Sequence, residues 1–198
     1  MDKSVVRAWV LLAALTVTGL ALDLATKHWA DASIACGEQI RLVGSMLSLV
    51  LVHNRGAVFG MNPQKWFPGF PVNVFFAVFT VIAVGVILVY YHRVALRDRL
   101  VQWGLILVLP GALGNLFDRV VRPAKGVVDF IMIDLNVWPA DPWPVFNFAD
   151  MYVTFGVACM LASLVRDEWR RHQAAATATA APSPGPQAGA SQDPSAGT

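Results

Sequence analysis

Four long apolar runs, separated by polar and turn-forming segments, dominate the pattern of this chain: Val5–Leu22, Val72–Tyr91, Leu100–Leu116 and Phe148–Val165. Each run has about 17–20 residues, and a helix rising about 1.5 Å per residue needs that length to cross roughly 30 Å of bilayer hydrocarbon. The pattern therefore predicts an α-helical polytopic membrane protein with four transmembrane helices.

The first run has an alternative interpretation as a cleavable signal peptide, because Lys3 and Arg7 precede it and the stretch Ser33–Cys36 follows it. However, charged residues such as Asp23 and Asp31 separate the run from any cleavage site. The run also exceeds the roughly 7–15 apolar residues of a signal peptide. We therefore expect a retained membrane helix.

The two longest segments between the runs are predicted to lie on the outer side of the membrane. In the first, "IRLVGSMLSLVLVH" is rich in Leu and β-branched residues and is interrupted by Gly44, which predicts two short strands. In the second, "GVVDFIMIDL" fits either a strand or a short helix lying against the bilayer.

The final segment, from His172 to Thr198, consists mainly of Ala, Pro, Gly, Ser, Thr and Gln and has no aromatic residue. This composition cannot bury enough apolar area to offset the entropy lost on ordering. The sequence therefore predicts a membrane domain over residues 1–171 and a disordered cytoplasmic tail over residues 172–198.

Composition and charge agree with this organisation. Of the 198 residues, 56% are hydrophobic and 14% are charged, whereas soluble domains have roughly 25% charged residues. Arginines are densest in the short loop Arg93–Arg99, which four helices place on the same side as both termini, and this predicts cytoplasmic termini. The net charge of +2 gives no reason to expect a nucleic-acid partner. Cys36 and Cys159 are too few for a disulfide framework.

Polar residues that are distant in sequence fall at one level of this topology, the outer edge of the hydrocarbon. Asp23 is predicted to end the first helix there. The other residues of this set are Asn54, Asn115, Asp118, Arg119, Asp129, Asn147 and Asp150. A carboxylate at this depth is costly unless it is paired, hydrated or neutralised, so the convergence indicates a functional site.

Several members of the set also have a purely structural interpretation. Asp23 and Lys27 are spaced i, i+4 and can form an ion pair on one helix. Asp118 with its neighbour Arg119 can anchor a helix end at the interface. Asn147 can cap the fourth helix, whose dipole favours a carboxylate in the first turn, where Asp150 lies.

The chemistry that fits these residues is hydrolysis by two carboxylates. The sequence has no Ser–His pair, and its four histidines lack metal-ligand spacing. Two close aspartates share a proton, so the ionised one can activate water while the neutral one protonates a carbonyl oxygen. Asp129 and Asp150, which have no cation beside them in sequence, are the candidates.

Five short stretches resemble, in order and spacing, the signature motifs of lipoprotein signal peptidase (signal peptidase II): "DLATK", "NRGAVFG", "GNLFDR", "VVDF" and "FNFAD". The resemblance covers about residues 5–166 and implies an aspartic endopeptidase of the bacterial plasma membrane. It implies Asp129 and Asp150 as the catalytic dyad and Asp23, Lys27 and Asp118 as supporting residues. The residues implied to bind and position the substrate are Asn54, Gly56, Asn115, Arg119 and Asn147.

The resemblance also implies the partners and the remaining parts of the fold. The substrates would be diacylglyceryl prolipoproteins cut before the lipidated cysteine, within membrane lipids and without a cofactor or metal, and globomycin would be an inhibitor. A small extracytoplasmic β-sheet and a lid helix would lie in the first outer loop. The chain departs from the family at Met132, where a further Asp is common, and in the insert "WPADPWP".

Two other classes of protein are alternatives. In a proton-coupled transporter, Asp23 and Asp150 would form a proton relay, although such groups usually lie near the membrane midplane between repeated halves. In a structural membrane subunit, all the polar motifs would tolerate substitution by alanine.

Overall fold

The computed structural model describes residues 2–55, 67–94, 96–134 and 144–180. Within this part of the chain, four helices and three strands follow in the order α1 (Lys3–Ser33), β1 (Gln39–Val43), β2 (Leu47–Asn54), α2 (Val72–Val94), α3 (Arg99–Val121), β3 (Val127–Ile133) and α4 (Phe148–Ala180). Each of the four helices is long and apolar enough to cross a membrane, which confirms the four predicted spans.

The chain divides into two compact units, residues 1–163 and residues 164–198. The helix α4 belongs to both units, because it begins at Phe148 and continues through His172 to Ala180. The first part of the predicted tail is therefore helical, and the boundary expected at residue 171 is not a break in the helix. Residues 181–198 lie outside the described residues.

The apolar side chains of the helices are distributed as expected for a protein surrounded by lipid. Large side chains such as Val17, Val74, Phe79, Ile82 and Leu164 are more than half exposed. Between α1, α2 and α3, a smaller set is buried as a core: Ala8, Leu12, Tyr91, Val101, Leu105, Ile106 and Leu109. Lipid tails are as apolar as these side chains, so the outward-facing apolar surfaces of the helices need no protein packed against them.

The first helix is longer than its apolar run. Asp23 was expected to end this helix, but α1 continues to Ser33, so Asp23 and Lys27 lie within it and both are fully buried. The prediction of a helix end at Asp23 is therefore wrong. The apolar run ends near Asp23 because the following part of α1 contacts buried polar side chains of α3. The helix itself continues beyond the run.

The three strands form an antiparallel sheet in the order β1–β2–β3. Gly44, with φ of +53°, lies in the turn between β1 and β2, which confirms the two predicted strands. The ambiguous segment "GVVDFIMIDL" contains a strand rather than a helix: Val52 of β2 pairs with Asp129 of β3. Most of the insert "WPADPWP" lies outside the described residues, as do residues 56–66 of the first outer loop, in which the lid helix was expected.

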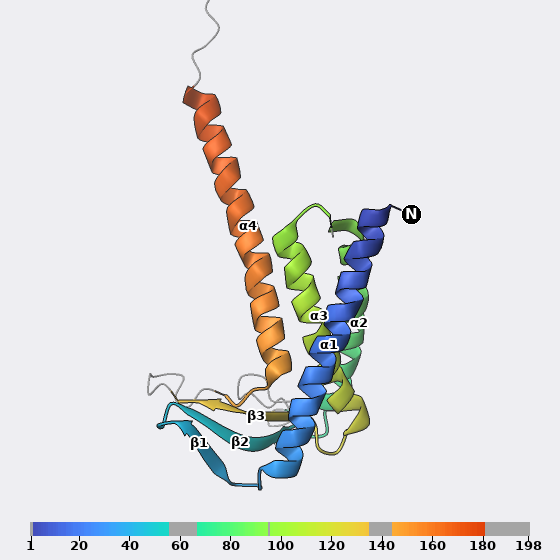
Figure 1. The fold of residues 1–198 in the computed structure, drawn as a ribbon, viewed down its shortest axis with the longest axis vertical. Coiled ribbons are helices and arrows are strands. Elements are labelled where there is room, and N and C mark those ends of the chain that lie inside the picture. Colours follow the sequence, from blue (N-terminus) through green and yellow to red (C-terminus); the bar gives the residue numbers. More distant parts are fainter. Residues whose placement is uncertain (1, 56–66, 95, 135–143, 181–198) are drawn as a thin grey trace, which may run out of the picture. The chain divides into compact units, whose positions relative to one another are not determined.

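The sheet lies at one end of α1, α2 and α3, which we call the sheet end (Figure 1). A second buried cluster joins it to α1, with Ala30, Ile34 and Phe130 at its centre. The opposite end of these helices, around Tyr91, is here called the Tyr91 end. The sheet thus lies at the end of the helices where their polar residues were predicted to converge.

Glycines bring the first part of α4 against α3. A Cβ at Gly104 would lie 2.7 Å from the carbonyl oxygen of Gly156, and a Cβ at Gly111 would overlap the carbonyl oxygen of Ala149. Small residues permit such close backbone contact between membrane helices. This contact places the N-terminal turn of α4 beside α3 at the sheet end.

Candidate active site

The residues predicted to carry chemistry converge at the sheet end from five elements. Asp23 and Lys27 come from α1, Asn54 from the last position of β2, and Asp129 from β3. The remaining ones are Asn115, Asp118 and Arg119 of α3 and Asn147 and Asp150 at the start of α4. Gly56 lies outside the described residues. The convergence brings together every described member of the predicted set.

Asn147 links the two candidate catalytic carboxylates. Its side-chain Nδ2 donates to Asp129 Oδ1 over 2.6 Å, and its backbone N–H donates to Asp150 Oδ2 over 3.2 Å. Its Oδ1 accepts from the backbone N–H of Asp150 over 3.1 Å. The last two bonds form a reciprocal capping box. Asn147 is therefore a helix cap, as the structural interpretation held, and also the bridge between the two aspartates.

Asp129 is held in a nearly closed environment and is 3% exposed. Asn54 Nδ2 donates to its Oδ2 over 3.0 Å, on the side opposite the contact with Asn147. Burial, followed by the negative charge of Asp150, raises the pKa of Asp129 to about 7, although both amides and the charge of Lys27 oppose the rise. Asp129 therefore holds a proton up to near-neutral pH.

Asp150 lies in a more open environment than Asp129. Its side chain is only partly buried. It accepts hydrogen bonds from the backbone N–H of Asn147 and, over 2.9 Å, from Asn115 Nδ2. It also lies in the first turn of α4, where the helix dipole stabilises an anion. The two carboxylates thus share Asn147 as a hydrogen-bond donor.

Arg119 lies at the edge of this group. Its Nη1 donates to the carbonyl oxygen of Asn115 over 3.0 Å, and its guanidinium lies 5.4 Å from the ring centroid of Phe76. Arg119 is partly exposed, and the charges of Asp150 and Asp129 act on its guanidinium. A group with five donors in this position can bind a peptide carbonyl.

The predicted ion pair between Asp23 and Lys27 is present, with Nζ and Oδ2 2.8 Å apart. Lys27 also contacts Asp118 and Asn115, which the spacing of the sequence did not reveal. Asp118 accepts the backbone N–H of Val128. This buried ion cluster accepts hydrogen bonds from the backbone N–H groups of Val128 and Ala149, the residues that precede Asp129 and Asp150.

Two contacts of the site escaped the sequence analysis. Asn73 Nδ2 donates to the carbonyl oxygen of Arg119 over 2.9 Å, and the ring of Phe76 packs on the guanidinium of the same residue. Asn73 was visible as a polar residue at the start of an otherwise apolar run, which is the signal that identifies it. Phe76 carries no such signal among the many apolar residues of α2.

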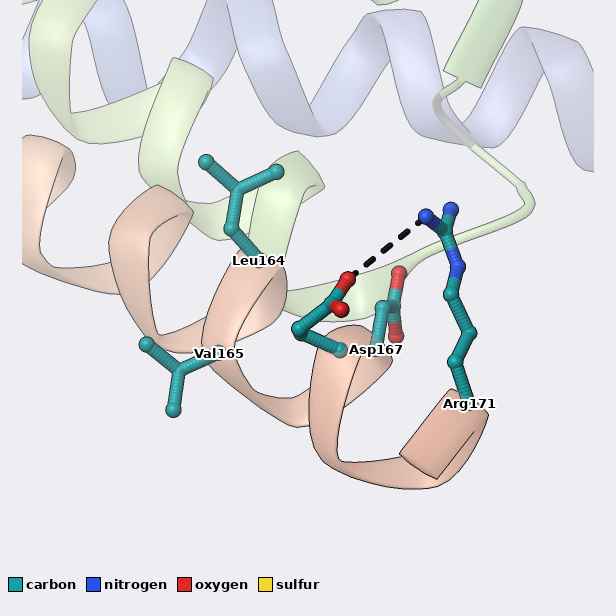
Figure 2. Close-up of a pocket in the computed structure, with 5 residues that line it drawn as sticks. Leu164, Val165, Asp167 and Arg171 are labelled. Carbon is teal, nitrogen blue, oxygen red and sulfur yellow. Dashed lines mark ion pairs between the residues drawn. The ribbon is translucent and has the colours of Figure 1, made fainter. Parts of the chain in front are cut away.

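A hollow of about 370 Å³ in the second unit does not belong to this site. Figure 2 shows its lining, formed by Leu164, Val165, Asp167, Glu168 and Arg171, with Arg171 Nη1 3.6 Å from Glu168 Oε2. The ion pair is highly exposed and therefore contributes little stability. Among the described residues, no group of three His, Cys, Asp or Glu side chains is placed to hold a metal ion.

The geometry gives no support to a proton relay between Asp23 and Asp150. Asp23 uses Oδ1 to accept the backbone N–H of Ala149 over 2.9 Å and Oδ2 to bind Lys27. Both carboxylate oxygens of Asp23 therefore already have partners, and neither partner is Asp150. The transporter alternative is therefore unsupported.

Comparisons with known proteins agree with the motifs. The sequence model described as signal peptidase (SPase) II matches residues 15–166. The lipoprotein signal peptidase of Geobacter sulfurreducens is 33% identical over 80% of this chain and 93% of its own length. That of Geobacillus thermodenitrificans is 39% identical over 75% of this chain and 84% of its own length. A solved structure titled as a bacterial membrane enzyme superposes with a TM-score of 0.68 and 26% identity, covering 79% of this chain and 88% of that one.

Proposed function

This chain belongs to the signal peptidase II family, and on that premise we propose that it removes signal peptides from diacylglyceryl prolipoproteins, cutting before the lipidated cysteine. It is a multi-pass bacterial membrane peptidase. The observation that carries the proposal is the pair Asp129 and Asp150, from separate elements, held by hydrogen bonds to the same Asn147. We propose that this pair makes it an aspartic peptidase.

The two aspartates have different roles in the proposed reaction. Asp150 is the general base, because it is partly exposed, accepts two hydrogen bonds and lies at a helix N-terminus. Asp129 is the general acid, because burial and the charge of Asp150 raise its pKa to about 7. Below about pH 7, Asp129 therefore carries the proton that the proposed reaction needs.

The steps follow from that protonation state. A water molecule attacks the scissile carbonyl carbon and gives a proton to Asp150, while Asp129 gives its proton to the carbonyl oxygen. The product is a tetrahedral diol. The C–N bond then breaks as the leaving amine takes the proton from Asp150, and a diol hydroxyl returns a proton to Asp129. One water is consumed, and the pair regains its starting state.

The amides and the arginine position the reacting groups. Asn54 and Asn147 fix both oxygens of Asp129, and Asn115 fixes Asp150. Arg119 projects its guanidinium beside the pair, and we propose that it binds a carbonyl of the substrate backbone together with these amides. Holding reactants in an attack geometry contributes several orders of magnitude to the rate of an enzyme.

The location of the site suits a lipid-modified substrate. Removing an acyl chain from the bilayer costs about 0.8 kcal/mol per CH₂ group, so cleavage is easiest where the lipid already lies. We propose that the substrate enters sideways from the bilayer, that the site faces the extracytoplasmic side, and that both termini are cytoplasmic. We also propose that globomycin inhibits the enzyme by occupying this site.

The decisive experiment is cleavage of a synthetic diacylglyceryl prolipoprotein peptide by the purified full chain in lipid bicelles. Asp129→Asn and Asp150→Asn each remove one proton-transferring group, so each is expected to lower kcat by about 10³-fold or more. Asp167→Asn is the matched control, because it makes the same chemical change in the second unit, and it is expected to retain the wild-type rate. Wild-type rates in both dyad variants would refute the proposed mechanism.

A further inference from the structure

Lys27, near the C-terminal end of α1, is the most completely buried cation of the described residues, with an exposed fraction of 0%. Its ammonium nitrogen lies 2.8 Å from Asp23 Oδ2, 2.9 Å from Asn115 Oδ1 and 3.2 Å from Asp118 Oδ2. An ammonium group has three N–H donors. Two ion pairs and one hydrogen bond therefore surround the ammonium group, and none of the three partners is on the sheet or on α4.

Each of the three acceptors reaches onward to one part of the catalytic pair. Asp23 Oδ1 accepts the backbone N–H of Ala149, the residue before Asp150, over 2.9 Å. Asn115 Nδ2 donates to Asp150 itself.

The third acceptor serves the other aspartate. Asp118 Oδ2 accepts the backbone N–H of Val128, the residue before Asp129, over 3.3 Å. Lys27 therefore contacts three side chains, one of which is hydrogen-bonded to Asp150 and two to the residues that precede Asp150 and Asp129.

We propose that Lys27 is the residue that positions both catalytic aspartates, by tying the start of α4 and the strand β3 to one ammonium group. It is a positioning residue and does not touch the substrate. The inference rests on the proposed function of Asp129 and Asp150.

An alternative role for Lys27 is to neutralise Asp23 and Asp118 so that the helices can fold. This role does not account for the contact with Asn115, which is uncharged. The ammonium at Oδ1 obliges the amide of Asn115 to present Nδ2, a donor, to Asp150. A flipped amide would place an oxygen against the carboxylate.

Lys27 can be removed without changing the net formal charge of the buried cluster. Lys27, Asp23 and Asp118 sum to one negative charge. The double variant Lys27→Met with Asp23→Asn keeps that sum, because Asp118 alone remains charged. The oxygen of the new amide at position 23 can still accept the N–H of Ala149, so the main loss is the ammonium group.

A second variant displaces the cluster without changing any charge. A Cβ on Gly114 would overlap Asp23 Oδ2. Gly114→Ala therefore moves the Asp23 carboxylate away from its present contacts with Lys27 and Ala149. It provides the same test in a protein whose ionisable groups are all intact.

The experiment measures kcat, KM and their pH dependence for the full chain in bicelles with the diacylglyceryl prolipoprotein peptide. Both variants are expected to lower kcat by about 10²-fold, since small displacements of catalytic groups have effects of that size, while KM changes by less than about twofold. Asp98→Asn, which weakens the cap of α3 at the Tyr91 end, is the structural control and is expected to retain kcat.

The pH profile separates positioning from general stabilisation. The charged groups that act on Asp129 are Asp150 of α4, Lys27 of α1 and Arg119 of α3. Because the positive charge of Lys27 lowers the pKa of Asp129, the double variant is expected to lose activity at a higher pH than the wild type. Gly114→Ala retains Lys27, so the pH at which its activity is lost is expected to shift less.

Two results would overturn the inference. One is an unchanged kcat and pH profile in a double variant that unfolds at the wild-type temperature. The other is a loss of kcat matched by an equal rise in KM in Gly114→Ala, which decides the matter if the double variant does not fold. Failure of the proposed function is distinct, because Asp129→Asn and Asp150→Asn would then cleave at the wild-type rate.

Discussion

The sheet end and the Tyr91 end of the membrane helices both bury polar groups, but they use them differently. At the Tyr91 end, the hydroxyl of Tyr91 donates to the carbonyl oxygen of Ala8 over 2.7 Å, and Asp98 caps α3 by accepting from Leu100 N over 2.8 Å. Each contact satisfies a backbone group or joins two helices. At the sheet end, Asp23, Lys27, Asp118 and Asp129 are all at most 3% exposed.

The difference teaches how to recognise a functional site in a membrane protein. One neutral hydroxyl is enough to fix two helices, and a buried ion pair is often no better for stability than apolar packing. Four buried ionisable groups therefore exceed what packing requires. On the proposed function, chemistry explains their presence at one end, because a neutral acid and a carboxylate must lie close together there.

The largest expected effect on this comparison comes from replacing Asn147, which caps α4 and, in the proposed function, positions Asp129. Asn147→Ala removes the donor to Asp129 and the cap of α4 together. We expect kcat to fall by about 10²-fold and stability to fall by about 1 kcal/mol. Peptide cleavage and thermal unfolding in bicelles measure the two effects.

The matched variant Asn147→Ser distinguishes the two roles. Serine is an effective helix cap, but its side chain is too short to span the present contact with Asp129. Asn147→Ser should therefore unfold at close to the wild-type temperature, while its kcat stays as low as that of Asn147→Ala. Recovery of both quantities would mean that the amide bridge is not required for catalysis.

The pH dependence is the next largest effect and concerns the sheet end alone. Because burial and Asp150 raise the pKa of Asp129 to about 7, the protonated acid is lost above that pH. The rate should fall about tenfold per pH unit on the alkaline side. Profiles of kcat/KM between about pH 5 and pH 9 measure it, and a flat profile would contradict the assignment of Asp129 as the acid.

The same raised pKa also changes stability, with a definite sign. The folded chain binds the proton of Asp129 more tightly than the unfolded chain does, so this group favours folding most at low pH. Its contribution is lost as the pH rises from its ordinary value of 3.8 through about 7. The free energy of unfolding should therefore decline over this window in the wild type and less in Asp129→Asn.

The smallest expected effect is at the Tyr91 end. Tyr91→Phe removes the hydrogen bond to Ala8 while keeping the aromatic contact with Trp9, whose ring centroid is 5.3 Å away. We expect a loss of about 1 kcal/mol in stability with kcat and the pH profile unchanged. A large fall in kcat would show that the two ends are coupled, and the comparison would then fail.

Much of the fold could be predicted because it depends on local patterns. Length and hydrophobicity located the four helices, and the Leu-rich segment broken by Gly44 located β1 and β2. The segment around Asp129 stayed ambiguous, because an apolar run of that length fits a strand or a helix equally. Only its pairing with β2 made it a strand.

The candidate site was predicted as a set of residues, but its connections were not. Spacing of i, i+4 revealed the pair Asp23 and Lys27, because neighbours on one helix are determined by the sequence alone. The contact of Lys27 with Asn115 joins residues 88 positions apart. No periodicity encodes a contact at that separation.

The sequence by itself determined that this protein lies in a membrane, how many membrane helices it has, and which residues bring charge to one level of the bilayer. These follow from the transfer of side chains between water and lipid, which each residue contributes nearly independently. The tertiary structure alone decided that Asn147 bridges the two aspartates, that α1 extends past Asp23 to Ser33, and that Lys27 stands behind both. Those features depend on hydrogen bonds with a range of about 3 Å, which exist only once packing has brought distant segments together.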